Sequence, residues 1–396
     1  MAVATLDDWL AEPGGVRGRR VFVRADLNVP LPGGRVGDDT RIRAALGSLR
    51  RLLAGGARVV LASHLGRPKG APKPELSLRP VGARLEELLG RPVAFCGECV
   101  GPVAEAAAAK LRDGEVLLLE NLRFHEEEEK NDAGFARQLA ALADAYVNDA
   151  FGTAHRAHAS TAGIVPFVSR AAAGDLMRAE LEHLRVVREP ERPLVCFLGG
   201  AKVSDKLAVL EALAPHTDVL AVGGAMAYTF LLAQGLPAGA SRVEPDRVPD
   251  AQRVLAAARS AGRELLLPVD HLVAQKLEAG APTRIVKEIP DGWLGVDIGP
   301  ETATRYAAVA RRARTIFWNG PMGVFEIDAF AKGTEAVARA VAESGARSVV
   351  GGGDSLAAVN KLGLGARIGH LSTGGGASLE YVQGLALPGV VALEKP

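Results

Sequence analysis

The chain has 396 residues, of which 48% are hydrophobic and 23% charged, which is typical of a globular protein with more than one domain. Its 47 Lys and Arg residues balance 46 Asp and Glu residues, so the net charge of +1 favours neither nucleic acid nor a membrane surface as a partner. The sequence contains no uncharged apolar run of membrane-spanning length and no signal-peptide pattern near Asp7 and Asp8, so we expect a cytoplasmic protein.

Three cysteines in so long a chain argue against a disulfide framework and favour a reducing compartment. Cys96 and Cys99 form a Cys-x-x-Cys motif after a predicted strand, a spacing that redox and zinc sites share. A second Cys pair or a nearby His would be needed to complete a metal site, and the sequence offers neither. Ordinary packing is therefore favoured, with a redox or metal role as the alternative.

Short apolar runs alternate with helical periodicity through the first half, which predicts a parallel α/β sheet. Strands are expected at 21–23, 59–62, 93–95, 116–119 and 145–148, and a helix at 78–89. Asp39 and Thr40 are typical of a helix start, and Arg41 falls in that first turn. A basic residue there opposes the helix dipole, so we expect Arg41 to have a task other than stabilising the helix.

Basic residues follow the strands of this half. Right-handed crossovers place the carboxyl ends of parallel strands on one edge of the sheet, so these residues should gather there. The set comprises Arg24, Arg41, His64, Arg67, Arg123, His155, Arg156 and His158. Arginine forks suit a small ligand that bears both phosphate and carboxylate. The acidic run 126–129 is interpreted as the solvated edge of a loop.

The second half repeats the pattern after a predicted connecting helix at 175–187. A strand at 194–198 ends at Gly199-Gly200, and the helix expected next would place Lys202 and Lys206 on neighbouring turns. Paired ammonium groups beside exposed backbone N–H groups suit a polyphosphate. Two solvated lysines on an amphipathic helix are the alternative.

Further strands are expected at 219–222, 265–267, 315–318 and 348–350. The last strand ends in three glycines at 351–353, followed by Asp354 and Ser355, where a helix should begin. Glycine lets backbone N–H groups approach a phosphate, and Asp354 could hold a magnesium ion on it. The dinucleotide fingerprint and the Walker A loop are both missing from the sequence, which disfavours both kinds of site.

These motifs together resemble those of phosphoglycerate kinases, in order and over essentially the whole chain. The segments that carry the resemblance are 24–30, 63–68, 120–124, 149–160, 199–206, 318–326, 351–355 and 373–378. The resemblance implies two Rossmann-like three-layer α/β domains with mostly parallel sheets, joined by a hinge helix and facing across a cleft. The N-terminal domain would comprise 1–173 and 377–396, and the nucleotide-binding domain 174–376, with the connecting helix at 174–189.

The resemblance also implies the reaction and its residues. The acyl phosphate of 1,3-bisphosphoglycerate would pass to MgADP, giving 3-phosphoglycerate and MgATP, in a monomer with no nucleic-acid or membrane partner. Arg41 and Lys202 would stabilise the phosphoryl group in flight, and Asp354 would hold the metal. The substrate set would be Arg24, Asp26, Leu27, Asn28, Arg41, His64, Leu65, Gly66, Arg67, Arg123, His155 and Arg156. The nucleotide set would be Lys206, Gly295, Glu326, Gly352, Gly353, Asp354 and Ser355.

Departures from the family pattern are small: Ala25 and Leu27 replace the commoner Val and Phe, and Glu126-Glu127 stands where many relatives have Pro-Gly. None of these changes removes a ligand-binding side chain. Two other functional classes fit the sequence less well than the kinase. A polyanion-binding module would leave Asp354 and the second glycine-rich face without a role, and a nicotinamide dehydrogenase would need the missing fingerprint.

Overall fold

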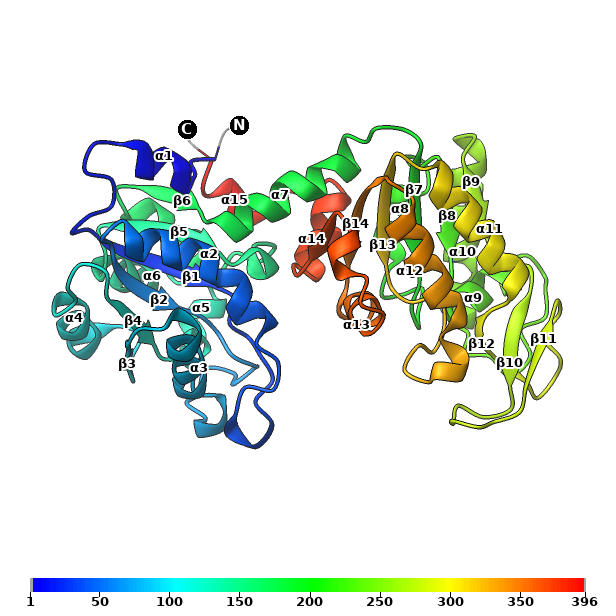
Figure 1. Ribbon diagram of the computed structural model, residues 1–396, viewed down its shortest axis with the longest axis horizontal. Helices are drawn as coiled ribbons and strands as arrows, with labels where there is room; N and C mark the ends of the chain where they lie inside the picture. Colours follow the sequence, from blue (N-terminus) through cyan, green and yellow to red (C-terminus); the bar gives the residue numbers. More distant parts are fainter. Residues whose placement is uncertain (1–2, 395–396) are drawn as a thin grey trace. The chain divides into compact units, whose positions relative to one another are not determined.

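The computed structural model describes residues 3–394, and Figure 1 shows them coloured along the chain. The chain divides into two compact units, Met1–Leu181 with Ala386–Pro396, called unit 1 here, and Glu182–Leu385, called unit 2. The first division falls within helix α7 (Asp175–Arg188), close to the domain boundary that the sequence suggests at 173/174. In the described part of the chain, none of the helices is long and apolar enough to cross a membrane.

Unit 1 is built on a parallel sheet, and the sequence predicted all of its strands except the last. Within residues 3–394 the sheet has six strands in the order β3-β4-β2-β1-β5-β6. They are β1 (Arg20–Ala25), β2 (Arg58–Ala62), β3 (Val93–Cys96), β4 (Val116–Leu119), β5 (Ala145–Asp149) and β6 (Ala171–Ala173). Strand β6 is three alanines long, too short and too weak in strand propensity to show in the sequence.

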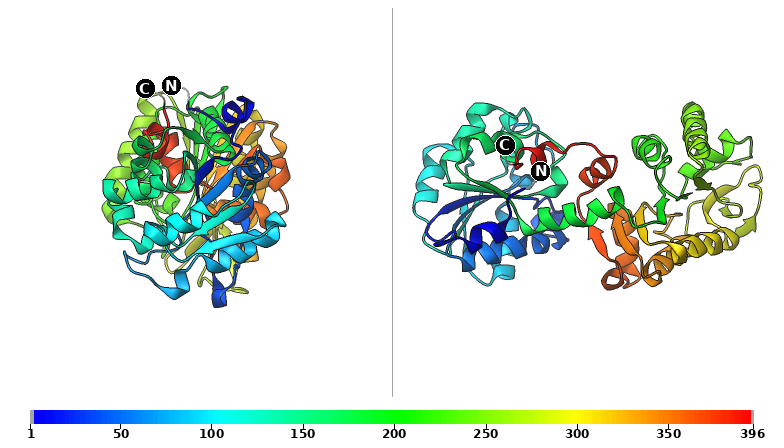
Figure 2. Two further views of the ribbon diagram at one scale, coloured as in Figure 1. Left: turned by 90° about the vertical axis from the view of Figure 1, so that its left-hand side faces the viewer. Right: turned by 90° about the horizontal axis from the view of Figure 1, so that it is seen from above.

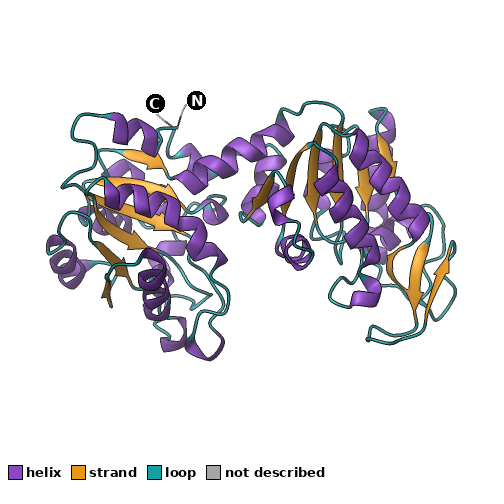
Figure 3. Cartoon of the chain, viewed as in Figure 1, coloured by secondary structure: helices purple, strands orange, loops and turns teal. Residues whose placement is uncertain are grey.

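Helices cover both faces of this sheet, as Figures 2 and 3 show. The helices of unit 1 are α1 (Leu6–Ala11), α2 (Thr40–Ala54), α3 (Arg79–Leu89), α4 (Gly101–Ala109), α5 (Glu126–Glu129), α6 (Ala133–Ala141) and α15 (Pro388–Val391). Helix α2 buries Ile42, Leu46, Leu49 and Leu53, three or four residues apart, in the core cluster that also holds Val23 of β1. Burying each of these side chains contributes about 1.5–3 kcal/mol. Core packing therefore fixes the start of α2 next to the carboxyl ends of the strands.

Unit 2 repeats the architecture with a second parallel sheet. Its strand order is β15-β14-β13-β7-β8-β9. The strands are β7 (Leu194–Leu198), β8 (Val219–Val222), β9 (Glu264–Leu266), β13 (Thr315–Asn319), β14 (Arg347–Gly351) and β15 (His370–Ser372). The helices are α8 (Leu207–Leu213), α9 (Met226–Ala233), α10 (Val248–Ser260), α11 (Pro300–Arg312), α12 (Lys332–Glu343), α13 (Gly353–Lys361) and α14 (Gly376–Val382). The two mostly parallel α/β sheets confirm the predicted fold class.

A small antiparallel sheet in unit 2 was not predicted. It has the order β11-β10-β12, from β10 (His271–Ala274), β11 (Thr283–Val286) and β12 (Leu294–Ile298). Strand β11 is almost fully exposed and carries no buried alternation, so its sequence resembles that of a loop.

The helix predicted directly after Gly200 begins instead at Leu207, so Lys202 and Lys206 do not lie on successive helical turns. Ser204 donates from its N–H and Oγ to the Glu244 carboxylate, at 3.0 and 2.6 Å, and this holds the segment as a loop. Glu244 lies forty residues away in the sequence, so local periodicity could not reveal its effect. The prediction of a helix at 201–206 was therefore wrong.

The sequence suggests that the acidic run 126–129 is the solvated edge of a loop, and the structure shows that this is only partly right. It forms the single helical turn α5, and the side chain of Glu128 is fully buried whereas its three neighbours in the turn are exposed. Four identical residues give no periodicity that could mark one of them as buried. The partner of Glu128 comes from a distant segment, as described below.

Candidate functional site

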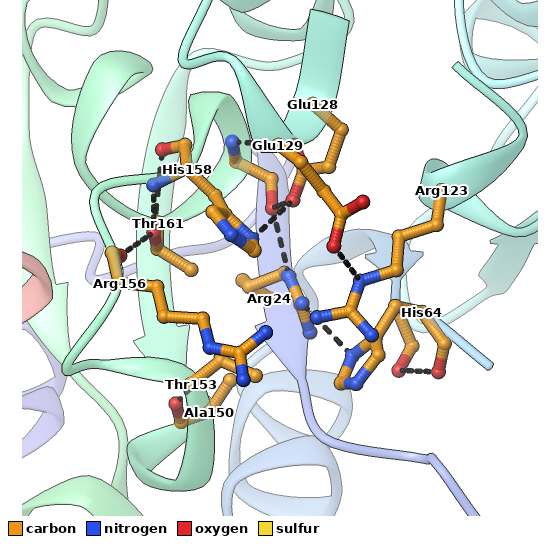
Figure 4. A network of polar contacts seen from close by, with 12 residues as sticks. Arg24, His64, Arg123, Glu128, Glu129, Ala150, Thr153, Arg156, His158 and Thr161 are labelled. Carbon is orange, nitrogen blue, oxygen red and sulfur yellow. Dashed lines mark hydrogen bonds and ion pairs between the residues drawn. The ribbon is translucent and has the colours of Figure 1, made fainter. Parts of the chain in front are cut away.

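The parallel register of unit 1 brings the predicted basic residues together. Arg24 on β1 pairs with Ala62 of β2 on one side and with Asn148 of β5 on the other. Chain segments leaving these three neighbouring strands therefore emerge side by side. Figure 4 shows the resulting group, called here the basic cluster, which consists of Arg24, His64, Arg123, Arg156 and His158.

Arg24 is fully buried at the centre of the basic cluster. Its Nε donates to Ser160 Oγ at 2.8 Å, and its Nη2 lies 3.1 Å from Nδ1 of His64. Burial and the neighbouring guanidinium groups, Arg24 first among them, hold the pKa of His64 well below its ordinary value. His64 is therefore neutral, and its Nδ1 accepts the hydrogen bond from Arg24.

Arg123 and His158 experience the same concentration of positive charge. Burial is the main cause that lowers the pKa of Arg123, and Arg24 and Arg156 lower it further. The pKa of His158 falls to about 3 for the same reasons. Arg123 Nη1 donates to Gly66 O at 2.9 Å, which keeps the guanidinium in place. The buried guanidinium groups that lower these pKa values would be stabilised by a bound anion.

Asp26 and Asn28 shape the loop that follows β1. The Asp26 carboxylate accepts a short hydrogen bond from Arg41 Nη1 and another, of 3.2 Å, from the N–H of Asn28. The side-chain oxygen of Asn28 in turn accepts from Gly66 N at 2.9 Å. Arg41 stands at the start of α2, as predicted, and one end of its partly exposed guanidinium is held by Asp26.

The remaining members of the predicted substrate set differ in their surroundings. Leu27 and Leu65 have buried side chains, and their N–H groups donate to Ser63 Oγ and Asn121 Oδ1. Both residues therefore contribute to the shape of the loops. Arg67 is exposed, and within residues 3–394 it forms no hydrogen bond or ion pair. His155 Nε2 lies 3.3 Å from Arg156 Nε at the side of the basic cluster.

Unit 2 gathers a second group of polar and glycine residues at the carboxyl ends of its central strands. Asn319 at the end of β13 pairs with Leu198 of β7 and Gly351 of β14. The ammonium of Lys206 donates to both the backbone oxygen and the side-chain oxygen of Asn319. Burial lowers the pKa of Lys206 to about 8, against the opposing effect of Asp354 and Asp205.

Glycine is required where these loops approach one another. Gly320 has φ 97°, and a Cβ there would lie 2.1 Å from Gly199 O and 2.7 Å from Lys206 Nζ. The N–H of Gly320 donates to Ser355 Oγ at 2.6 Å, so Ser355 fixes the start of α13 against this loop. Asp354, in the first turn of α13, is exposed. The loops thus expose backbone close to an ammonium group and a helix N-terminus, a combination that favours phosphate.

Gly295 and Glu326, the other predicted nucleotide residues, lie outside this group of contacts. A Cβ at Gly295, on β12, would lie 2.2 Å from the ring of Tyr228, so glycine permits close packing there. Glu326 is exposed in the turn after β13. In the described residues, no hydrogen bond or ion pair links either of them to Lys206 or Asp354.

Three polar residues that organise these sites were not in the predicted sets. Asn121 binds the backbone of both Leu65 and Arg123, Asn319 binds Lys206, and Glu128 binds Ser160. Asn121 and Asn319 each follow or end an apolar strand, a position that could have marked them. No comparable signal distinguishes Glu128 from the glutamates beside it.

Cys96 and Cys99 are both buried free thiols. Burial raises the pKa of the Cys99 thiol well above its ordinary value, and its Sγ lies 3.0 Å from Glu120 O. Among residues 3–394, no three His, Cys, Asp or Glu side chains are arranged to hold a metal ion. These features favour the packing interpretation of the Cys-x-x-Cys motif.

Comparison with known proteins places this geometry in one family. The family profile for phosphoglycerate kinase matches residues 12–385. A phosphoglycerate kinase from Moorella thermoacetica is 61% identical, covering 95% of this chain and 96% of that protein, and one from Rubrobacter xylanophilus is 59% identical, covering 96% of each. The structure of phosphoglycerate kinase from Coxiella burnetii superposes with a TM-score of 0.90 at 39% identity, covering 99% of both chains. The chain therefore belongs to the phosphoglycerate kinase family.

Proposed function

We propose that the basic cluster of unit 1 binds the phosphoglycerate and that the loops around Lys206 and α13 in unit 2 bind the nucleotide phosphates. The family's reaction is the reversible transfer of a phosphoryl group between 1,3-bisphosphoglycerate and ADP. The observation that carries the first assignment is the grouping of the buried Arg24 and Arg123 around His64, since a phosphate and a carboxylate would neutralise their positive charge. Five of the eight predicted basic residues take part in this cluster.

The chemistry requires no covalent intermediate with the protein. The bond between the phosphorus and the carboxyl oxygen of the acyl phosphate breaks, a bond to a β-phosphate oxygen of ADP forms, and the carboxylate leaves without needing a proton. The protein must align the reactants and neutralise the equatorial oxygens of the phosphoryl group. We assign that neutralisation to Arg41 and Lys202.

Arg41 and Lys202 suit this task because neither side chain is fully engaged in the ligand-free protein. Asp26 binds one terminal nitrogen of the Arg41 guanidinium, so the opposite edge keeps donors for a ligand. Lys202 is partly exposed and, in the part of the chain that the structure describes, forms no hydrogen bond or ion pair. An ammonium that forms no hydrogen bond within the described residues can bind the phosphoryl oxygens without first breaking one.

A magnesium ion that accompanies the nucleotide fits the residues of α13. Asp354 offers one exposed carboxylate, and magnesium commonly binds one or two carboxylates together with substrate phosphates and water. The described residues provide no metal cage of several ligands, which agrees with an ion that arrives on the nucleotide. When bound, the ion would offset the charge of the phosphates. A monomeric state and a cytoplasmic location remain part of the proposal.

Two single substitutions in the full-length enzyme test the division between the units. Calorimetry with Arg156→Ala should show weakened binding of 3-phosphoglycerate and normal binding of ADP, and Lys206→Ala should show the reverse. The side chain of Arg156 is partly buried and, among the described residues, hydrogen-bonds only to His155, so its truncation should leave the fold intact. Equal loss of both ligands in either variant would contradict the assignment.

A further inference from the structure

Glu128 is a buried carboxylate placed against the basic cluster. It has no exposed surface, whereas Glu126, Glu127 and Glu129 of the same helical turn are all exposed. A buried carboxylate is costly unless hydrogen bonds and opposite charge compensate it. Burial raises the pKa of Glu128, and Arg24 is the strongest opposing influence. The position therefore has a cost in stability that calls for a role.

The hydrogen bonds of Glu128 lead to Arg24 through one intermediate residue, Ser160. Ser160 donates from its N–H to Oε2 at 2.9 Å and from its hydroxyl to Oε1 at 2.6 Å. The same hydroxyl oxygen accepts from Arg24 Nε at 2.8 Å. Figure 4 shows Glu128 beside Arg24 and His158.

The direction of this chain is fixed by chemistry. An ionised carboxylate can only accept, so the Ser160 hydroxyl proton must point to Glu128 and its lone pairs must face the Arg24 guanidinium. Arg24 then donates from Nη2 to the neutral His64 and from Nη1 to Ala25 O. Three separate contacts therefore set the orientation of the Arg24 fork, and the one through Ser160 depends on Glu128.

We propose that Glu128 is a positioning residue for phosphoglycerate recognition, which holds Arg24 in its binding orientation through the Ser160 hydroxyl. The proposal rests on the assignment of Arg24 to the substrate site. Glu128 does not itself face the ligand in this scheme. Its carboxylate offers a separate oxygen to each Ser160 donor, whereas an amide in the same place would put an NH₂ group opposite one of them.

Replacement of Glu128 by glutamine separates two effects of opposite sign. Loss of a buried negative charge makes the basic cluster more positive, which by charge alone would tighten the binding of an anion. Loss of the acceptor turns one Ser160 donor toward an NH₂ group and weakens one of the three contacts that orient Arg24, which would weaken binding. The positioning role requires the second effect to win.

The test is calorimetry and steady-state kinetics on the full-length enzyme with Glu128→Gln and, as a matched control, Glu127→Gln. The control removes the same charge from the adjacent, exposed residue of α5. For Glu128→Gln we expect the 3-phosphoglycerate dissociation constant and KM to rise about tenfold, the scale of one charge-assisted hydrogen bond. The ADP dissociation constant and kcat at saturation should stay within about threefold, and Glu127→Gln should resemble the wild type.

Other outcomes identify which part of the reasoning fails. Unchanged or tighter 3-phosphoglycerate binding in Glu128→Gln would overturn the positioning role. Wild-type affinity in Arg24→Ala would instead overturn the substrate assignment on which it rests. If Glu128→Gln does not fold, Ser160→Ala removes the connecting hydroxyl and should give the same selective loss. If both single variants fold, the double variant should bind no more weakly than the worse of them, and an additive loss would refute a shared path.

Discussion

The affinity of the enzyme for ADP should fall as the pH rises above 8, and Lys206 should be the cause. Burial lowers the pKa of the Lys206 ammonium from its usual value of 10.5 to about 8 in the ligand-free protein. A nucleotide phosphate beside the ammonium would favour its charged form and return the pKa toward its ordinary range. Above pH 8, ADP binding must therefore take up a proton.

The expected magnitude follows from the two pKa values. With a pKa of about 8 without ligand and a much higher one with ADP, affinity should fall about eightfold between pH 7.5 and 9, or about 1.2 kcal/mol. Burial raises the pKa of Cys99, Cys196 and Tyr228, which keeps those groups from titrating in this window. The ADP phosphates are already fully ionised.

Calorimetry at pH 7.5 and 9, in buffers of different ionisation enthalpy, would measure both the affinity and the proton taken up. Lys206→Met should bind ADP weakly with little dependence on pH, whereas Lys202→Met should keep the wild-type slope. A wild-type slope near zero, or the same slope in Lys206→Met, would refute the reasoning. In the absence of ligand, the unfolded chain binds the Lys206 proton more readily than the folded protein does. The free energy of unfolding of the free enzyme should therefore rise between pH 8 and 10.5.

Substitutions at three further residues give further tests. Arg41→Ala should lower kcat about a hundredfold with a much smaller loss of 3-phosphoglycerate affinity. Arg41→Lys should recover only part of the rate, and a coupled assay would measure both variants. Burial raises the pKa of Asp149 to about 6, so the folded protein binds this proton more readily than the unfolded chain. As the pH falls from 7 to 4, the free energy of unfolding of the wild type should therefore rise by at most about 3 kcal/mol relative to that of Asp149→Asn, measured by urea unfolding. Magnesium should raise the affinity for ADP by a factor about tenfold smaller in Asp354→Asn than in the wild type, measured by calorimetry with and without the ion.

Strands and their order along the chain were predictable because parallel sheets buried on both faces produce apolar runs. The run 194–198 became β7 with the same bounds, and 116–119 became β4. Once these strands are parallel, their carboxyl ends must meet, so the gathering of Arg24, His64 and Arg123 also followed from the sequence. The resemblance to the family added the identity of the ligands, which residue spacing alone could not supply.

The two wrong interpretations, of 201–206 and of 126–129, share a physical cause, which is side-chain contact between distant segments. Apolar periodicity favoured a helix from residue 201, but the bonds from Ser204 to Glu244 hold this segment as a loop. In the same way, Ser160 determines that Glu128 is buried while its neighbours are exposed. Local propensity contributes tenths of a kcal/mol per residue, whereas a charge-assisted hydrogen bond contributes about 1.5–3 kcal/mol, so the distant contact decides the outcome.

The near-neutral net charge of +1 conceals the feature on which the candidate substrate site depends. Buried cations can stand close together only if something compensates them before the ligand arrives. Asp26 contacts the partly exposed Arg41 directly, and Glu128 reaches the buried Arg24 through a serine. A direct ion pair from Glu128 would engage the guanidinium donors that the ligand needs, whereas a contact through Ser160 occupies only Nε. Because Ser160 stands between Glu128 and Arg24, the carboxylate offsets the charge of the guanidinium and still leaves the Arg24 fork oriented.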